Sequence, residues 1–197
     1  MDSREFFNSM AEKWDSSVKH DDAKIRRILD IAGIGPGSAI LDAGTGTGVM
    51  VPYLRSLAGK SGRIVAVDIS EKMINVARRK YSFENVEFIV ADMLEAGLPE
   101  NYFDCVMCYS VFPHFPDKKA AVARLARCLK KGGKLVVCHS QSRDAINKLH
   151  MDAPEAVKSD RLPDVRTIER FFTEAGLKSA ALIDNDEMFV AVGIRQN

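Results

Sequence analysis

The sequence predicts an α/β fold in which a doubly wound sheet of seven strands is covered by helices on both faces. Short β-rich runs alternate with helical patterns along the chain, which is typical of parallel strands joined by crossover helices. Only a few polar residues around Asn185 and Asp186 separate the last two apolar runs, which favours an antiparallel hairpin after five parallel strands. A length of 197 residues with 46% hydrophobic residues suits a single domain with one core.

The individual elements follow from periodicity and from local start and stop signals. Strands are expected at 38–42, 63–68, 86–91, 103–109, 134–139, 178–183 and 188–194. Helices are expected at 3–16, 22–32, from the glycine-rich loop to about 57, after 70, from 117 to about 130, at 143–150 and at 165–175. Gly33 ends the second of these helices, and Ser70 and Asp117 are N-caps of later ones.

Composition and charge exclude several classes of protein. The net charge is +1, without the basic field that a nucleic-acid partner requires. No apolar run approaches a membrane span, and the chain starts without an apolar signal core, so we expect a cytoplasmic protein with no membrane partner. Cys105 and Cys108 lie three residues apart in a strand pattern and point to opposite faces, so we expect free thiols and no metal site.

The most informative segment runs from an apolar strand through a glycine-rich turn into a helix. Asp42, Gly44, Gly46 and Gly48 follow one another at alternate positions in LDAGTGTG. Glycines let the backbone approach a ligand closely, and the following helix directs its free amides to the same place. In an open α/β sheet this turn lies in the crevice at the carboxyl ends of the strands, where ligands bind.

Two more carboxylates end the next two strands. Asp68 ends the second strand in IVAVD, and Asp92 follows the third in EFIVAD. A carboxylate in the position of Asp68 can accept hydrogen bonds from both hydroxyls of a ribose. Together with the glycine spacing, these residues predict a nucleoside site rather than a simple strand-to-helix turn.

This arrangement resembles the class I S-adenosylmethionine-dependent methyltransferases, whose first motif, E/D-x-G-x-G-x-G, matches Asp42, Gly44, Gly46 and Gly48. The resemblance covers about 38–139 strongly, although Lys131 replaces the proline often found before the two glycines of the fifth-strand loop. It implies a Rossmann-like fold, S-adenosylmethionine as cofactor, and methyl transfer. It further implies that Asp92 accepts from the adenine amine, that the amide of Met93 reaches a ring nitrogen, and that Ile69 and Met93 flank the adenine.

Within the family, the chain is similar to the small-molecule methyltransferases of the ubiquinone/menaquinone-biosynthesis type. We therefore expect one domain over 1–197, with an N-terminal helical lid at 1–33, a cofactor-binding core at 38–139 and a substrate-side cap at 140–163. The modest size of these additions favours a small-molecule methyl acceptor. We expect a monomer or homodimer, and the sequence leaves the acceptor and the accepting atom open.

Candidate catalytic groups lie after the fourth and fifth strands. The resemblance places the end of the fourth strand beside the methyl group, which makes Cys108 a candidate contact for the cofactor and Tyr109 a candidate catalytic residue. The sequence CYSV there differs from the Asn/Asp-Pro-Pro-Tyr/Phe signature of methyltransferases that act on adenine or glutamine amino groups. His139 and His114 are the candidate general bases, with His139 the first choice, because both strand ends open onto the predicted crevice.

Three other interpretations remain open at this level. A nicotinamide-dependent oxidoreductase shares the architecture, but its fingerprint requires a glycine where Val49 stands. A non-catalytic protein that binds S-adenosylmethionine and acts as a regulator needs no catalytic residue. In a third alternative, the thiols of Cys108 and Cys138 together with His114 and His139 present soft ligands to a metalloid or metal-bearing acceptor.

Overall fold

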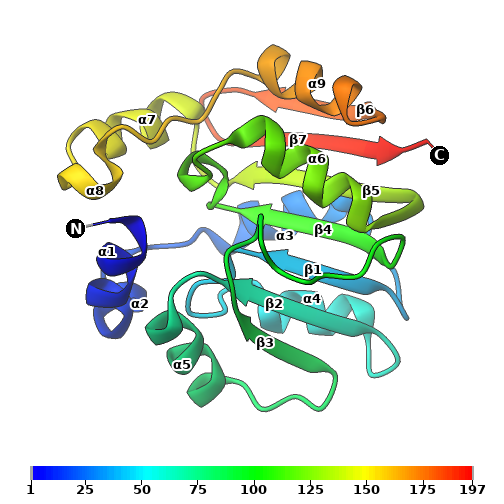
Figure 1. The fold of residues 1–197 in the computed structure, drawn as a ribbon, viewed down its shortest axis with the longest axis horizontal. Helices are drawn as coiled ribbons and strands as arrows, with labels where there is room; N and C mark the ends of the chain where they lie inside the picture. Colours follow the sequence, from blue (N-terminus) through cyan, green and yellow to red (C-terminus); the bar gives the residue numbers. More distant parts are fainter. Residues whose placement is uncertain (1, 197) are drawn as a thin grey trace.

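The computed structural model describes residues 2–196, so Met1 and Asn197, the two ends of the predicted domain, lie outside the described residues. Within this range one sheet has the strand order β3-β2-β1-β4-β5-β7-β6 (Figure 1). The strands are β1 (Ala39–Ala43), β2 (Arg63–Asp68), β3 (Val86–Val90), β4 (Phe103–Tyr109), β5 (Leu129–His139), β6 (Leu177–Asp184) and β7 (Phe189–Arg195). Strands β1 to β5 are parallel, and β7 is antiparallel to both β5 and β6. The predicted fold class is confirmed.

Most of the helices begin at a residue whose side chain caps their first free amides. They are α1 (Ser3–Met10), α2 (Trp14–Ser17), α3 (Asp22–Ala32), α4 (Val51–Ala58), α5 (Glu71–Lys80), α6 (Lys118–Cys128), α7 (Arg143–Met151), α8 (Glu155–Lys158) and α9 (Val165–Glu174). Ser70 accepts from the amide of Met73, and Asp117 accepts from the amide of Ala120, as the sequence predicts. Gly33 ends α3 in the left-handed region, with φ 61°.

Two hydrophobic cores lie on opposite faces of the sheet. On one face, Ile28 of α3 and Leu54 of α4 pack with Cys105. On the other face, α6 and α9 pack with Cys108. The prediction that these two cysteines point to opposite faces is confirmed, and both are free thiols.

Three elements differ from the sequence-based expectation. The first helix is interrupted by a 3-10 turn, η1 (Ala11–Lys13), where Ala11 is buried beside α5. Strand β5 begins at Leu129 rather than Lys134, because Leu129 already pairs with Phe103 before the register shifts at the glycine bulge. The stretch between the helices predicted at 143–150 and 165–175, for which no element is expected, contains the short helix α8.

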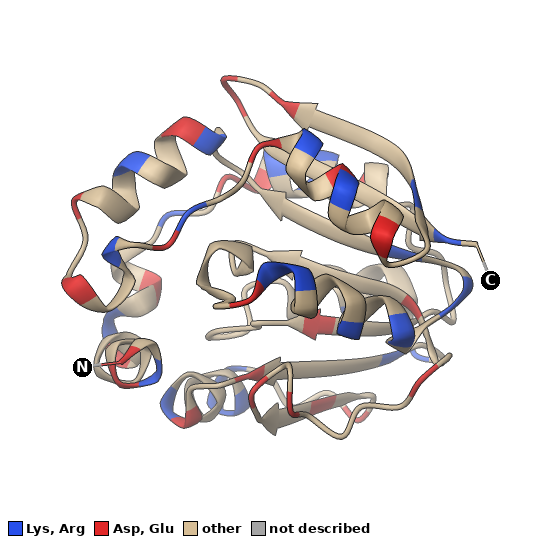
Figure 2. Ribbon diagram, turned by 45° about the horizontal axis from the view of Figure 1, so that its top comes forward, with Lys and Arg blue, Asp and Glu red and all other residues tan. Residues whose placement is uncertain are grey.

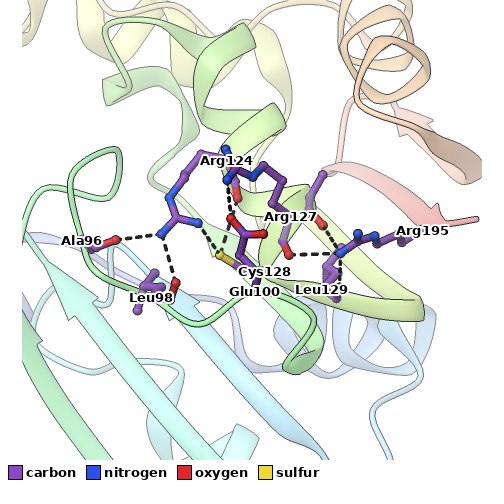
Figure 3. A network of polar contacts seen from close by, with 9 residues as sticks. Ala96, Leu98, Glu100, Arg124, Arg127, Cys128, Leu129 and Arg195 are labelled. Carbon is purple, nitrogen blue, oxygen red and sulfur yellow. Dashed lines mark hydrogen bonds and ion pairs between the residues drawn. The ribbon is translucent and has the colours of Figure 1, made fainter. Parts of the chain in front are cut away.

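A network of arginines holds the loop between β3 and β4, which carries Asp92 and Met93 (Figure 3). The guanidinium of Arg124 in α6 donates to the carbonyl oxygens of Ala96, at 2.8 Å, and of Leu98, at 3.2 Å. Arg127, one turn further along the same helix, pairs with Glu100. These contacts therefore fix the loop to α6.

Charged side chains of both signs are interspersed over the helices and loops (Figure 2), in keeping with the nearly neutral net charge. None of the helices within 2–196 combines the length and apolar character that crossing a bilayer would need.

Candidate functional site

A cavity of about 450 Å³ lies at the carboxyl ends of the parallel strands. Its wall comes from the N-terminal helices, the glycine-rich loop, the ends of β2, β3 and β4, and the segment after α8. In Figure 1, α1 and α2 lie together with α7 and α8 at the arrowhead ends of these strands. The volume falls within the range of small-molecule sites, and the position is the one where open α/β sheets bind ligands.

The three glycines of the loop have different surroundings. Gly44 lines the cavity and has φ +70°, and a Cβ there would lie 2.1 Å from Cγ2 of Val111, so this close approach requires glycine. Gly46 also lines the cavity, and space around its missing Cβ is open. Gly48 faces away toward α5, where a Cβ would lie 3.0 Å from the ring of Tyr81. Two of the three predicted glycines therefore border the cavity, and the third permits helix packing.

Asp68 connects the glycine-rich loop to the end of β2. Its Oδ2 accepts the amide of Gly46 at 2.8 Å, and its Oδ1 accepts the amide of Ser70 at 2.8 Å. Burial raises the pKa of this carboxyl, although these amides and the nearby His114 oppose the rise. The carboxylate lines the cavity and retains further lone pairs for a ligand.

The predicted adenine-side residues also border the cavity. Ile69, Asp92 and Met93 all contribute to its wall, and Oδ1 of Asp92 accepts the amide of Leu94 at 2.8 Å. The structure therefore brings Asp68 and these three residues to the wall of the same cavity.

Asp42 lies behind the glycine-rich loop and outside the cavity wall. Its side chain is 1% exposed and accepts a hydrogen bond of 2.6 Å from the hydroxyl of Thr45. Burial raises the pKa of this carboxyl to about 7, against the hydrogen bond from Thr45 and with a smaller contribution from Asp68. The residue supports the loop rather than contacting the cavity.

Tyr109 borders the cavity at the end of β4 and belongs to a chain of hydroxyl contacts. Its hydroxyl lies 2.9 Å from the hydroxyl of Ser140 and 3.0 Å from Nδ1 of His20. Burial raises the pKa of Tyr109 to about 12 and lowers the pKa of His20. His20 also lines the cavity, a role that its sequence context, ahead of a helix start, does not indicate.

Besides Asp42 and Gly48, two more of the predicted site residues lie away from the cavity. Cys108 is 0% exposed on the face covered by α6, because alternation along β4 turns it away from Tyr109. His139 is 1% exposed, and neither ring nitrogen has a hydrogen-bond partner among the described residues. Burial lowers the pKa of His139 to about 3. The expectation that it opens onto the crevice is corrected, since its side chain is buried and is not part of the cavity wall.

His114 borders the cavity in η2 (Phe112–His114), the 3-10 helix after β4. Its Nδ1 lies 2.6 Å from Oδ2 of Asp160, which follows α8 and also lines the cavity. The rings of Phe7 and His150 pack edge-on against the imidazole, each with a centroid distance of 5.0 Å. This histidine is therefore held by groups from both the N-terminal helices and the 140–163 segment.

The N-terminal helices are fixed over the cavity by polar contacts. Oδ1 of Asn8 accepts from the hydroxyl of Ser70 at 2.8 Å and from the amide of Lys72 at 3.1 Å. Asp15 accepts from the hydroxyl of Thr47 at 2.5 Å and pairs with Lys80 at 2.7 Å. Burial raises the pKa of Asp15, but these two partners outweigh it, so the net pKa is lowered.

The ligand set of the metalloid alternative does not converge. Cys108 and Cys138 belong to the cores on opposite faces of the sheet. Among residues 2–196, no cluster of three or more histidine, cysteine or acidic side chains has an arrangement that could hold a metal ion.

Comparison with known proteins identifies the family. Residues 41–137 match the family model described as a methyltransferase domain. The ubiquinone/menaquinone biosynthesis C-methyltransferase UbiE of Vibrio cholerae is 34% identical over 140 residues, covering 66% of this chain and 54% of that protein. UbiE of Pseudomonas entomophila is 30% identical over 168 residues, covering 81% of this chain and 65% of that protein. The chain thus spans about half to two thirds of the length of these curated relatives.

Solved structures share the fold over nearly the whole chain. A chain from the complex between the Haloferax volcanii Trm112 methyltransferase activator and a methyltransferase has a TM-score of 0.84 at 20% identity, covering 98% of this chain and 97% of that chain. An S-adenosylmethionine-dependent methyltransferase of Aquifex aeolicus has a TM-score of 0.74 at 21% identity, covering 95% and 97%. The match to the methyltransferase-domain model and to the UbiE relatives places the chain among the class I S-adenosylmethionine-dependent methyltransferases, and these solved structures share its fold.

Proposed function

We propose that this chain transfers the methyl group of S-adenosylmethionine to a small-molecule acceptor in the cavity at the strand ends. The observation that carries the proposal is the convergence of the open glycine Gly46, the carboxylate Asp68 and the Asp92–Met93 pair on one cavity. Glycine backbone, a strand-end carboxylate and flanking apolar side chains are the groups that an adenosyl ligand requires.

The cofactor residues then have distinct roles. Asp68 accepts the ribose hydroxyls, Asp92 accepts the adenine amine, and Ile69 and Met93 flank the ring. Gly44 and Gly46 let the backbone approach the amino-acid portion, while Asp42 and Gly48 support the loop from behind. Cys108 contributes to packing beneath this site.

Beyond aligning the reactants, the reaction requires few catalytic groups from the protein. The sulfonium of the cofactor supplies a methyl carbon that is already activated for displacement. The chain must hold the acceptor in line, exclude water and accept a proton where the acceptor carries one. We propose Tyr109 and His114 for accepting the proton, a role supported by their position in the cavity wall. His139 receives less support because of its burial.

The enclosed cavity suits a small acceptor. The segments 1–33 and 140–163 act as lid and cap over the 38–139 core, and Phe7, Trp14 and Asp160 from these segments line the cavity. The names of the UbiE relatives make an aromatic, quinone-related carbon one acceptor class to test. We retain a cytoplasmic location and a monomer or homodimer as expectations, with light scattering as the check on oligomeric state.

Calorimetric titration with S-adenosylhomocysteine tests the cofactor site. Asp68→Ala should weaken binding at least about tenfold, because a bidentate acceptor is lost. Asp186→Ala, which removes an exposed carboxylate from the β6–β7 turn, should leave the affinity unchanged. Equal affinity of the two variants, or tighter binding of NAD than of S-adenosylhomocysteine, would contradict the assignment.

Profiling of a cell extract with isotope-labelled methyl donor tests catalysis. A labelled small molecule supports the enzyme, whereas tight cofactor binding without any labelled product favours the non-catalytic regulator.

A further inference from the structure

We propose that Asp160 is a positioning residue for His114, and that the pair acts as a general base for an acceptor bearing an acidic hydroxyl of the phenol or enol type. The proposal rests on the proposed methyl transfer and specifies the acceptor class of that same site. It begins from the contact of 2.6 Å between Nδ1 of His114 and Oδ2 of Asp160, at the cavity wall.

The contact sets the tautomer of the imidazole. In a neutral histidine one ring nitrogen carries the proton and the other holds a lone pair, and the carboxylate selects Nδ1 as the protonated nitrogen. Nε2 of His114 has no hydrogen bond with any described residue. The lone pair that can accept a substrate proton therefore lies on the nitrogen that the protein leaves unused.

The pair is held rigidly from several sides. The side chains of His114 and Asp160 are 15% and 20% exposed, which leaves a small opening toward the cavity. Phe7 and His150 pack edge-on against the imidazole. Asn147 of α7 fixes the chain near Asp160 by donating to the carbonyl of Leu162 at 3.1 Å and accepting its amide at 2.7 Å.

The charged surroundings distinguish His114 from its neighbours. Asp160 and Asp68 are the carboxylates that interact with it, and the half-buried Lys118 interacts with Asp160. His139 and His150 lie close by without a carboxylate bonded to either ring, and burial first, then His114, lowers the pKa of both. Two histidines line the cavity, His20 and His114, and within 2–196 only His114 has a carboxylate bonded to its ring.

The step balances without a further reactant. The hydroxyl proton of the acceptor passes to Nε2 of His114, and the oxygen electron pair forms the bond to the methyl carbon. The carbon–sulfur bond breaks with its electron pair on sulfur, which leaves S-adenosylhomocysteine and a methyl ether. Asp160 stabilises the imidazolium, which later releases its proton to water.

Nitrogen-15 NMR of the histidines tests the positioning role on the full chain saturated with S-adenosylhomocysteine. His114→Gln identifies the His114 signals by their loss. In the unmodified protein we expect the tautomer with the proton on Nδ1. In Asp160→Asn the other tautomer should appear, because an amide can donate to Nδ1. Asp152→Asn, an exposed change in the same cap, should not alter the spectrum, and an unchanged tautomer in Asp160→Asn would overturn the proposal.

Labelled-methyl transfer to two phenols tests the base. With para-cresol, which keeps its proton in mildly alkaline buffer, His114→Gln should lower kcat at least about 100-fold and Asp160→Asn at least about tenfold, with little change in KM. Asp160→Glu should recover part of the loss. With para-nitrophenol, which is already ionised, the variants should stay within about tenfold of the unmodified protein.

The outcomes separate the two levels of inference. Equal losses of kcat with both phenols in the His114 and Asp160 variants would overturn the acceptor class and the base. Methylation of an amine or carboxylate probe but of neither phenol would overturn them as well. A protein that binds S-adenosylhomocysteine yet methylates no probe would also overturn it, while leaving the cofactor site intact. Failure to bind S-adenosylhomocysteine would instead remove the proposed function itself.

Discussion

At the scale of single residues, burial of the Asp42 carboxyl makes the stability of the folded protein depend on pH. It is 1% exposed, and Thr45 is its side-chain hydrogen-bond partner. Its pKa of about 7 in the folded protein lies well above the ordinary value of 3.8. The folded state therefore binds the proton more tightly than the unfolded chain does, so stability falls as the pH rises from about 4 to 7 and stays reduced above 7.

Asp42→Asn should remove this pH dependence. The amide keeps an acceptor for Thr45 but has no charge to desolvate, so the variant should exceed the unmodified protein in free energy of unfolding by up to about 4 kcal/mol at about pH 8. Near pH 4.5 the two should agree within about 1 kcal/mol. Urea denaturation at both pH values is the measurement, and Asp30→Asn, at an exposed position, is the control. A difference in free energy of unfolding between Asp42→Asn and the unmodified protein that does not change with pH would contradict the role of burial.

Sequence reasoning finds residues that a local motif marks and misses those that only the folded chain brings together. Asp68 and Asp92 could be predicted because each lies at or just after the end of an apolar strand, and Met93 because the family resemblance implies it; the structure places all three at the cavity. His20 and Tyr109 are 89 residues apart, and no local signal connects them. The same holds for His114 and Asp160, which are 46 residues apart.

At the scale of elements, predictions succeed where caps and periodicity are local. The bounds of α3 and β2 agree with the sequence-based expectation because Asp21 and Gly33 delimit α3 and the carboxylate Asp68 ends β2. The start of β5 could not be predicted, because it depends on pairing between Leu129 and Phe103 across a glycine bulge. The 3-10 break after α1 likewise depends on how Ala11 packs against a distant helix.

The N-terminal helices should control how fast the cofactor leaves. Asn8 joins α1 to the start of α5 through Ser70 and Lys72, so Asn8→Ala removes two hydrogen bonds that hold the helix over the cavity. A loss of about 1 to 1.5 kcal/mol would speed release of S-adenosylhomocysteine about tenfold. Stopped-flow dissociation is the measurement. Ser9→Ala changes an exposed residue of the same helix and should release S-adenosylhomocysteine at the rate of the unmodified protein. If Asn8→Ala also releases it at that rate, the helix is not part of the exit path.

At the scale of the whole molecule, two segments far apart in the sequence meet over the cavity. Helix α1 lies beside α8, and both lie at the carboxyl ends of the parallel strands (Figure 1). His114 contacts both regions, through Phe7 on one side and Asp160 on the other. The hairpin of β6 and β7 lies at the far edge of the sheet and does not contribute to the cavity wall.

A ligand in this cavity should therefore slow the opening of both segments together. With S-adenosylhomocysteine at about 100 times its Kd, linkage stabilises the bound state by about 2.7 kcal/mol, so openings that require release become about 100-fold rarer. Hydrogen exchange followed by mass spectrometry should show this protection in 3–17 and 155–158, with little change in the locally opening amides of 177–195. In Asn8→Ala the protection of 3–17 should shrink while 155–158 stays protected through the Asp160 contact with His114. Protection confined to the glycine-rich loop would show that the two segments do not close over the ligand.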